Sequence, residues 1–289
     1  MPFIASALCY IISLQAIYLS LRTTLTGSYI PLDHQGYTST VYHLPNDPTR
    51  VCKSFNQAFR NDLYPVEKAV YERFTAHGPP PSILAYYGPH PSLLASLILD
   101  YAEQGNLWNY LGERDSLNTP PPNATLLLRW ARQATEALAF AHDLDIFNGD
   151  IHPSNLFLDG ALNLKVGDWA GASIEGSLSR SSYRPRYRLV DAEGRDVPST
   201  EGVTVRTEIF ALGSALYFLV TGKEVWGEIE GGEEIRRLFA GGEFPRTDGL
   251  LVLGEVVERC WMGGFGSMEE VRQVIGEEEG RMGLRVQDG

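Results

Sequence analysis

Cysteine and basic residues are the scarce components of this 289-residue chain. Its three cysteines, Cys9, Cys52 and Cys260, are odd in number and widely spaced. That spacing predicts neither a disulfide framework nor a zinc site, and it fits a reducing compartment. Lysine and arginine number 24 against 36 acidic residues, and the resulting net charge of −12 argues against a nucleic-acid partner. We expect Cys52 to be a small core residue in a strand.

Internal repeats and low-complexity tracts are also missing. Hydrophobic residues make up 44% of the chain and charged residues 21%. This composition is typical of a globular protein with a sizeable core, arranged as one large domain or as two lobes.

Charge is missing from the first part of the chain, where residues 3–21 are nearly all apolar and Arg22 is the first basic residue. The stretch has no basic n-region and no small-residue cleavage site, which disfavours a secretory signal peptide. Its length is just enough to span a bilayer, and Arg22 at its C-terminal flank favours a cytosolic location for the rest of the chain. The alternatives to a membrane anchor are an apolar helix packed on the domain and an unstructured extension.

The residues 148–171 organise the rest of the chain. Asp150 is followed five residues later by Asn155. Two short apolar runs around Asp159-Gly160 then predict a β-hairpin, and Asp168 stands just past the second run. The hairpin would hold Asn155 and Asp168 at its open end, with Asp150 just before it. Three converging oxygen-bearing side chains suit Mg²⁺ and a phosphate.

This stretch resembles the catalytic loop and metal-binding turn of the protein kinases. The kinase pattern is His-Arg-Asp, four residues and Asn, followed later by Asp-Phe-Gly. The order and the spacing from Asp to Asn match here. The resemblance implies that Asp150 is the catalytic base toward the acceptor hydroxyl. It also implies that Asn155 and Asp168 hold the metal ions that neutralise charge on the transferring phosphoryl group.

The stretch departs from the kinase pattern at three places. Asn148 and Gly149 replace His and Arg, His152 replaces a Lys, and Trp169-Ala170 replaces Phe-Gly. In many kinases the missing arginine receives a phosphate from the activation segment, which Gly149 cannot do. We therefore predict that phosphorylation does not switch the activity through the usual ion pair.

An arginine-rich stretch, residues 179–188, occupies the place of the kinase activation and substrate-binding segment. Its arginines could recognise an acidic or phosphorylated substrate. The alternative is a solvated loop on an acidic protein.

Residues upstream match the nucleotide-binding strands of kinases. Gly36 is the one glycine kept from the Gly-rich loop, because His34 and Ser39 stand at the other two glycine positions. Val41 matches the valine that ends this loop. Lys53 lies twelve residues after Val41 in a predicted strand, and it matches the lysine that contacts the α- and β-phosphates.

A predicted helix over residues 65–74 carries the candidates for the glutamate that pairs with this lysine in kinases. Val70 and Phe74 repeat at helical spacing, and Glu67 precedes them at the distances typical of the family. Glu67 is the preferred candidate and Glu72 is the second choice.

The segment from Leu99 to Leu111 resembles the kinase hinge, in which an acidic residue and Tyr precede a glycine-centred link and a helix start. The resemblance implies that backbone groups of Asp100 and Ala102 bind the adenine. Leu99 would line the back of the nucleotide pocket.

Helices dominate the second half of the chain. A long helix over residues 125–142 would feed the catalytic loop, and residues 207–222 resemble the central helix of the large kinase lobe. Glu208 stands where the family has the Asp that anchors the catalytic-loop backbone. Further helices are predicted over three ranges, 233–240, 250–260 and 267–277, the last one with a capping-box pattern.

These features predict an α+β, two-lobed protein-kinase-like fold, with a five-stranded small lobe, a larger helical lobe and an ATP cleft between them. The expected parts are an apolar segment at 1–27, the small lobe at 28–102, the large lobe at 103–278 and a flexible tail at 279–289. The activity implied is transfer of the γ-phosphate of Mg²⁺-bound ATP to a hydroxyl of a protein substrate, with Ser and Thr as the default acceptors. The catalytic domain would be cytoplasmic, anchored to a membrane if residues 3–21 span it.

Two other functions stay open. Gly-Asp-Ile-His-Pro-Ser-Asn followed by Asp-Trp also resembles the loop of aminoglycoside and choline phosphotransferases, which act on small molecules. The eroded Gly-rich loop and the replacements at Gly149, His152 and Trp169 are compatible with a pseudokinase that binds partners without catalysis. The retained lysine and metal-binding side chains argue against that alternative.

Overall fold

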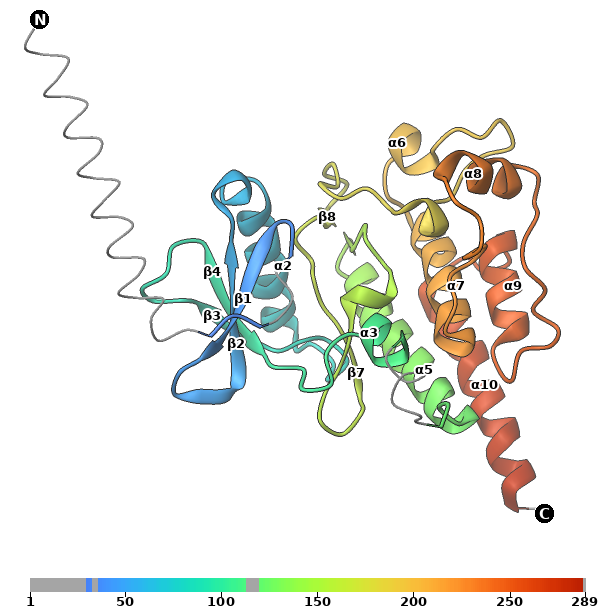
Figure 1. Cartoon of the computed structure of the whole chain (residues 1–289), viewed down its shortest axis with the longest axis horizontal. Helices are drawn as coiled ribbons and strands as arrows, with labels where there is room; N and C mark the ends of the chain where they lie inside the picture. The colour runs from blue at the N-terminus through green and yellow to red at the C-terminus, as the bar shows by residue number, and fades with distance from the viewer. Residues whose placement is uncertain (1–29, 33–35, 113–119, 288–289) are drawn as a thin grey trace, which may run out of the picture. The chain divides into compact units, whose positions relative to one another are not determined.

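The computed structural model describes residues 30–32, 36–112 and 120–287 of the chain (Figure 1). These residues form two compact units, and each is described by itself. The smaller unit holds the described residues up to Arg60 together with Tyr87–Tyr101. The larger unit holds Asn61–Tyr86 and the residues from Ala102 onward.

The smaller unit is built on a four-stranded sheet with the order β1-β2-β4-β3. The strands are β1 at Ser39–Leu44, β2 at Asp47–Phe55, β3 at Tyr86–Pro89 and β4 at Ser96–Asp100. β2 runs antiparallel to both of its neighbours, so that Lys53 pairs with Val41 on one side and with Leu97 on the other. Cys52 is fully buried, as expected, and burial raises the pKa of its thiol to about 11.

The predicted fifth strand of the small lobe is wrong for the described residues. Ahead of β1, Pro31 forms only an isolated bridge with Tyr42. The Leu32 N–H donates to Val41 O at 2.9 Å, and the His43 N–H donates to Ile30 O at 3.0 Å. These two bonds flank the Pro31–Tyr42 pair, so the proline nitrogen faces away from β1, and the described pairing ahead of β1 amounts to this one bridge.

The larger unit is mainly helical (Figure 1). Its helices are α2 Leu63–His77, α3 Leu107–Gly112, α5 Ala124–His142, α6 Val197–Glu201, α7 Val205–Thr221, α8 Gly232–Ala240, α9 Gly254–Met262 and α10 Met268–Gln287. Two short antiparallel pairs accompany them, β5 at Ile146–Phe147 with β8 at Ser173–Ile174, and β6 at Leu156–Leu158 with β7 at Leu164–Val166.

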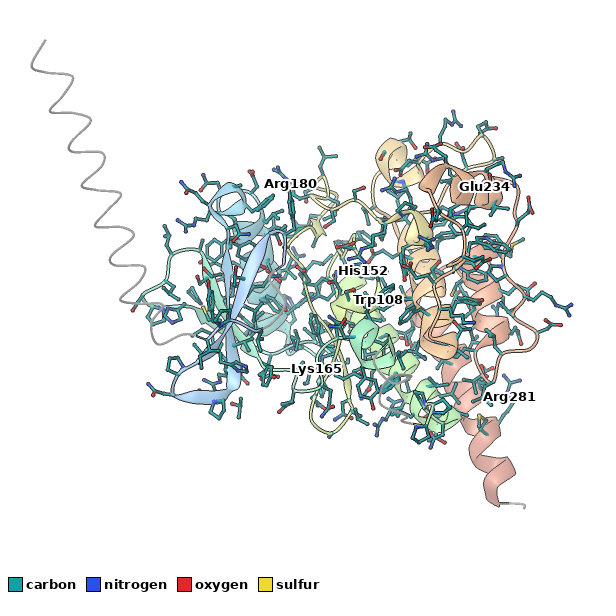
Figure 2. All side chains as sticks on the ribbon, viewed as in Figure 1. Trp108, His152, Lys165, Arg180, Glu234 and Arg281 are labelled. Carbon is teal, nitrogen blue, oxygen red and sulfur yellow. The ribbon has the colours of Figure 1, made fainter. Side chains whose placement is uncertain are left out.

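Helix α7 lies at the centre of the helical part, because most of its residues from Thr207 to Leu219 are buried. Thr204 and Thr207 form a reciprocal capping box at its start, and Gly222 in the left-handed region ends it. Trp261 of α9 donates its indole N–H to Ser214 Oγ at 3.1 Å. The side chain of Trp108 in α3, labelled in Figure 2, stacks on Phe218 with ring centroids 5.0 Å apart.

Helix α5 sets the position of the predicted hairpin, which the structure confirms as β6 and β7. Arg129 and Trp130 of this helix donate to Leu162 O at 2.9 and 2.8 Å, and Gln133 Oε1 accepts the Leu164 N–H at 2.8 Å. Asp159 closes the turn by accepting the N–H groups of Ala161 and Asn163. Helix α5, which precedes the hairpin in the sequence, thus holds the hairpin in place.

The C-terminal helix is longer than predicted, because α10 continues to Gln287 where a flexible tail was expected from residue 279. Two acidic side chains past the predicted end make tertiary contacts. Glu278 Oε1 accepts the N–H of Leu253 at 2.9 Å, and Glu279 pairs with Arg132 of α5 at 3.2 Å. These contacts stabilise a turn of helix that periodicity alone did not predict.

The two compact units are divided at other residues than the predicted lobes, whose bounds stay a prediction. Helix α2 belongs with the larger unit, whereas the expected small lobe at 28–102 included it. The contacts of α2 explain this. Phe74 packs on Phe140 of α5, and Arg73 pairs with Glu175 at 2.7 Å.

Within the described part of the chain, no helix has both the length and the apolar character that crossing a membrane requires. The predicted anchor at residues 3–21 lies outside the described residues.

Candidate active site

The open end of the β6–β7 hairpin brings two of the predicted site residues together. Asn155 directly precedes β6, and Asp168 follows β7 after one glycine. Leu156 pairs with Val166, and the Gly167 N–H donates to Asn155 O at 3.1 Å. The strand register therefore holds both residues at the same end of the hairpin.

Asn155 also fixes the loop that carries Asp150. Its Nδ2 donates to the Asp150 carbonyl oxygen at 2.9 Å and lies 3.3 Å from Asp150 Oδ2. The Asn155 side chain thus closes the loop that begins five residues earlier at Asp150. The Asp150 side chain is 29% exposed, so its carboxylate remains accessible to an acceptor group.

His152 is a buried neighbour of Asp150, and Figure 2 labels it. Its Nδ1 accepts the Ser154 N–H at 3.2 Å, which places the proton of a neutral ring on Nε2. Nε2 lies 3.5 Å from Asp150 Oδ2. The ring therefore presents a donor to the carboxylate while it caps the short 3-10 helix at Pro153–Asn155.

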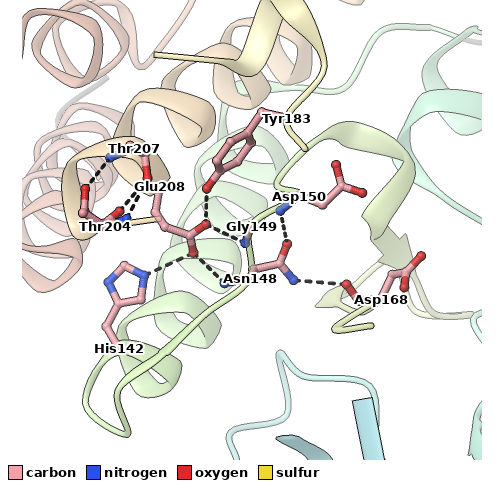
Figure 3. Close-up of polar contacts among 9 residues, drawn as sticks. All are labelled: His142, Asn148, Gly149, Asp150, Asp168, Tyr183, Thr204, Thr207 and Glu208. Carbon is pink, nitrogen blue, oxygen red and sulfur yellow. Dashed lines mark hydrogen bonds and ion pairs between the residues drawn. The ribbon is translucent and has the colours of Figure 1, made fainter. Parts of the chain in front are cut away.

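Glu208 of α7 holds the backbone of this loop through two N–H groups (Figure 3). Its Oε2 accepts the Asn148 N–H and its Oε1 accepts the Gly149 N–H, each at 2.9 Å. Glu208 is fully buried, and a buried carboxylate needs such donors to offset its loss of hydration. The longer arm of Glu therefore still anchors the loop where the sequence predicted an anchor.

Asn148 connects the loop to the turn after the hairpin. Its Nδ2 donates to Asp168 O at 3.2 Å, and its Oδ1 accepts the Asp150 N–H at 3.0 Å (Figure 3). Asp168 has a φ of 53°, a left-handed conformation that Asp tolerates better than most residues. The Asn148 amide side chain thus links the backbone of Asp150 to the backbone of Asp168.

Glu67 reaches the same turn from α2. Its Oε1 accepts the Trp169 N–H at 3.1 Å, and Glu67 is fully buried. The ring of Trp169 packs edge-on against Phe74, with centroids 4.9 Å apart. Glu72, the second choice, instead pairs on the surface with Lys68 at 2.7 Å. The structure brings Glu67, and not Glu72, to the site.

A family model described as a protein kinase domain matches residues 72–244, more than half of the chain. The chain belongs to the protein kinase domain family. The α+β kinase fold predicted from the sequence is confirmed, with its antiparallel sheet and its helical part.

Three curated relatives of the chain are named as serine/threonine-protein kinases. The chain is 32% identical over 138 residues to serine/threonine-protein kinase GIN4 of Saccharomyces cerevisiae, a match that covers 47% of this chain and 11% of that protein. It is 26% identical over 136 residues to serine/threonine-protein kinase PKH2 of the same yeast, covering 44% and 12%. It is also 28% identical over 126 residues to inactive serine/threonine-protein kinase PLK5 of Mus musculus, covering 44% and 20%. The chain therefore spans a fifth or less of the length of these three relatives.

The kinase match includes only part of the predicted site. Leu99, Asp100, Ala102, Asp150, Asn155 and Asp168 lie inside the matched residues. Four predicted residues precede the match, namely Gly36, Val41, Lys53 and Glu67. The assignment of these four depends on their motifs and on their positions in the structure.

In the smaller unit, the sheet brings Val41 and Lys53 opposite each other in β1 and β2. Lys53 is 6% exposed, and its Nζ lies 5.3 Å from the centre of the Phe55 ring on the same face of β2. Gly36 is exposed ahead of β1, and a Cβ there would lie 3.1 Å from Ser39 O. A side chain at position 36 would therefore crowd the loop backbone.

The predicted hinge begins inside β4, which contains Leu99 and Asp100, and continues past the end of that strand. Tyr101 donates its N–H to Thr49 O at 2.9 Å, which fixes the end of the sheet in the smaller unit. In the larger unit, the Gly105 N–H donates to Ala102 O at 2.9 Å, and Gly105 has a φ of +69°. The Asp100 side chain accepts from the Tyr87 hydroxyl at 2.7 Å. The proposed adenine contacts would use backbone groups, so this side-chain bond does not compete with them.

The donor set fits a magnesium ion. Asn155 uses its Nδ2 on Asp150, which leaves its Oδ1 as the oxygen that could bind a metal beside the Asp168 carboxylate. Two protein oxygens suit Mg²⁺, which keeps several waters and binds substrate phosphates. No group of three or more His, Cys, Asp and Glu residues suited to a metal occurs in the described part of the chain.

Sequence reasoning missed three residues that complete the site, Asn148 as a connector, His142 and Tyr183. His142 Nε2 lies 3.3 Å from Glu208 Oε2, and the Tyr183 hydroxyl donates to Glu208 Oε1. Burial first, and the Glu208 charge second, raise the pKa of Tyr183 well above its ordinary value. No motif predicts these contacts, because the partners lie 66 and 25 residues from Glu208 in sequence.

The arginine-rich stretch is partly structural. Arg186 donates to the carbonyl oxygens of Val225, Trp226 and Ile229 at 2.7 to 3.2 Å. Arg188 donates to Ser182 Oγ at 2.7 Å and pairs with Asp196 at 3.1 Å. Arg180 and Arg184 are exposed, so only these two arginines of the stretch are placed to meet an acidic partner.

Proposed function

We propose that this protein is an ATP-dependent protein kinase that transfers the γ-phosphate of ATP to a protein hydroxyl, with Ser and Thr as the default acceptors. The observation that carries the proposal is the Asp150–Asn155 loop, closed by the Asn155 amide and anchored by Glu208. This loop holds a partly exposed carboxylate beside the turn of Asp168, the arrangement that in-line transfer to a hydroxyl requires.

Each site residue has a role in this proposal. Asp150 accepts the proton of the acceptor hydroxyl and orients its oxygen toward the phosphorus. Asn155 and Asp168 would hold Mg²⁺, which would supply positive charge to stabilise the negative charge on the phosphoryl group. Lys53 would contact the α- and β-phosphates, and Glu67 is the candidate for the glutamate that pairs with this lysine in kinases. The remaining nucleotide contacts fall to residues at the Gly-rich loop and the hinge, namely Gly36, Val41, Leu99, Asp100 and Ala102.

A pseudokinase is the second candidate, because one curated relative is named as inactive and the Gly-rich loop keeps a single glycine. A pseudokinase would retain the fold and the buried contacts around Glu208 without transfer. Nucleotide binding by itself does not separate the two candidates, since both could bind ATP.

Phosphate transfer from labelled Mg²⁺-ATP by the full chain tests the proposal. The acceptors are a mixture of proteins and, separately, a panel of aminoglycosides and choline. Asp150→Ala should lower the rate by about 100-fold or more, as expected for loss of a general base. The control is Asp248→Ala, which removes an exposed carboxylate paired with exposed Arg246 and should leave the rate unchanged.

The labelled acceptor decides the substrate class. Labelled protein supports the proposal, and labelled small molecule would replace it with a small-molecule phosphotransferase. Transfer by the folded wild type that equals that of Asp150→Ala would refute catalysis and favour the pseudokinase.

A further inference from the structure

Glu208 is a buried carboxylate with four donors, and one of them comes from the arginine-rich stretch. Two donors are the N–H groups of Asn148 and Gly149 at 2.9 Å. The third is His142 Nε2 at 3.3 Å, and the fourth is the Tyr183 hydroxyl (Figure 3). Each carboxylate oxygen therefore has one backbone donor and one side-chain donor.

The stretch around Tyr183 lies directly on the catalytic loop. Ser179 Oγ donates to Gly171 O at 2.7 Å, and the Arg180 N–H donates to the same oxygen at 2.9 Å. Gly149 has a φ of +77°, and a Cβ there would lie 2.6 Å from Ser179 Oγ. The absence of a side chain at position 149 thus leaves room for this stretch to approach the loop.

Tyr183 is 1% exposed, so its hydroxyl has no access to bulk water. Burial and the adjacent charge of Glu208 raise its pKa, so that the phenol remains protonated and donates throughout the neutral range. A donor to a buried carboxylate is worth more than a donor to a neutral group.

The Tyr183 hydroxyl matters because residue 208 is Glu. Glu has one more methylene than the Asp that the kinase pattern predicts here, and hence one more rotatable bond. A longer arm needs further contacts to hold its carboxylate in a single rotamer. The Tyr183 hydroxyl on Oε1 and His142 on Oε2 supply them on either side.

We propose that Tyr183 is a positioning residue, whose hydroxyl holds Glu208 in the rotamer that orders the Asn148 and Gly149 amides and thereby the Asp150 loop. The effect of the Tyr183 hydroxyl on the rate of phosphate transfer rests on the proposed kinase function. Its effect on the order of the Asp150 loop does not.

The chain offers a matched control in Tyr187. This tyrosine is also 1% exposed, and it also bonds a carboxylate, with its hydroxyl 3.3 Å from Glu224 Oε1. Glu224 follows the end of α7, and its other side-chain partner among the described residues is Arg186 rather than a group of the catalytic loop. Tyr187→Phe therefore removes an equally buried hydroxyl without touching Glu208.

The test compares wild type, Tyr183→Phe and Tyr187→Phe by hydrogen exchange and by kinetics. In Tyr183→Phe the amides of Asn148 and Gly149 should exchange about tenfold faster or more, while those of α9 keep their wild-type protection. The kcat for phosphate transfer should fall about tenfold, and KM for ATP should stay within about twofold. Tyr187→Phe should leave loop exchange and kcat within about twofold of wild type.

Two results would overturn the proposal. One is unchanged exchange at Asn148 and Gly149 in folded Tyr183→Phe. The other is faster exchange that extends equally to α9, which would show general destabilisation, including partial unfolding of the variant. If wild type transfers no phosphate, the kinase proposal fails, yet the exchange comparison still decides whether Tyr183 orders the loop.

Discussion

His152 uses its two ring nitrogens for separate contacts. Nδ1 accepts the Ser154 N–H at 3.2 Å, and Nε2 faces Asp150 Oδ2 at 3.5 Å. The ring stands where the kinase pattern has a lysine, so an imidazole takes that place beside Asp150, the proposed catalytic base. The two contacts can be tested separately, because Asn and Gln each resemble one half of the imidazole.

We predict that His152→Asn lowers kcat by about three- to tenfold with little change in stability. The Asn oxygen lies near the position of Nδ1 and can still cap Ser154, whereas the donor to Asp150 is lost. His152→Gln should keep most of kcat and lose about 1 kcal/mol of stability, the usual cost of a lost cap. Steady-state kinetics and urea unfolding of both variants measure this. Equal kcat values for the two variants would contradict separate roles for the nitrogens.

The sequence around Glu67 and Glu72 does not decide which of these two glutamates reaches the candidate site. Both lie on the predicted helix at plausible positions, and the sequence ranked them only by analogy. In the structure Glu67 is fully buried and accepts the Trp169 N–H, while Glu72 is a half-exposed partner of Lys68. The helix face that packs on Trp169 decides between them, and that packing involves a residue 102 positions away.

At the scale of elements, the arginine-rich stretch is held by its own side chains. Arg186 and Arg188 are engaged by carbonyl oxygens and by Asp196, and Tyr183 is engaged by Glu208. Gly149 offers no cation at the position where many kinases receive a phosphate. We therefore expect unmodified contacts to supply the ordering that phosphorylation provides in many kinases.

We predict that phosphatase treatment of the purified protein leaves its transfer rate within about twofold, because no phosphate-dependent ion pair orders the stretch. Ser181→Ala should behave in the same way. Ser179→Ala should instead destabilise the protein by about 1 kcal/mol, since it removes the donor to Gly171 O. Phosphate transfer and urea unfolding measure the two effects. A phosphorylated Ser or Thr in the arginine-rich stretch, residues 179–188, that raises the activity of the purified protein would contradict the prediction.

The helices and strands that are determined by nearby residues were predicted well. The β6–β7 hairpin follows from its turn residues, and α5 and α7 follow from their apolar patterns and caps. For the described residues, the predictions of a fifth strand in the small lobe and of the end of α10 were wrong. Both features depend on partners elsewhere in the chain. In the described residues ahead of β1 the pairing is a single bridge at Pro31, and the later turns of α10 contact Leu253 and Arg132.

At the scale of the whole molecule, α10 joins the last part of the chain to two earlier helices. Glu278 caps the start of α9 through the Leu253 N–H, and Leu253 itself has a φ of +65°. Glu279 pairs with Arg132 of α5, and both side chains are about one-third exposed. The first contact is the stronger one, because an exposed ion pair contributes little.

We predict that truncation after Glu277 lowers the free energy of unfolding by about 1–3 kcal/mol, mostly through loss of the Glu278 acceptor. In the full chain, Glu278→Ala should reproduce most of that loss. Glu278→Gln keeps an acceptor and should lose less than half as much. Urea unfolding with far-UV circular dichroism measures these differences. A truncated chain as stable as the full chain would show that the end of α10 contributes nothing.

The sequence by itself determined the family and the order of the site residues. Asp150, Asn155 and Asp168 could be assigned because a loop and a hairpin of about twenty residues set their spacing, and short-range geometry is encoded locally. The helices followed for the same reason, since capping and periodicity act within a few residues.

The tertiary structure alone decided which groups satisfy the buried charges. Glu208 takes its donors from His142, Asn148, Gly149 and Tyr183, which lie 25 to 66 residues away. A buried carboxylate must find donors, but sequence does not state which distant side chains the packing will bring to it. For that reason the candidate catalytic residues and the Glu208 anchor could be named from the sequence, and the side chains that hold Glu208 in place could not.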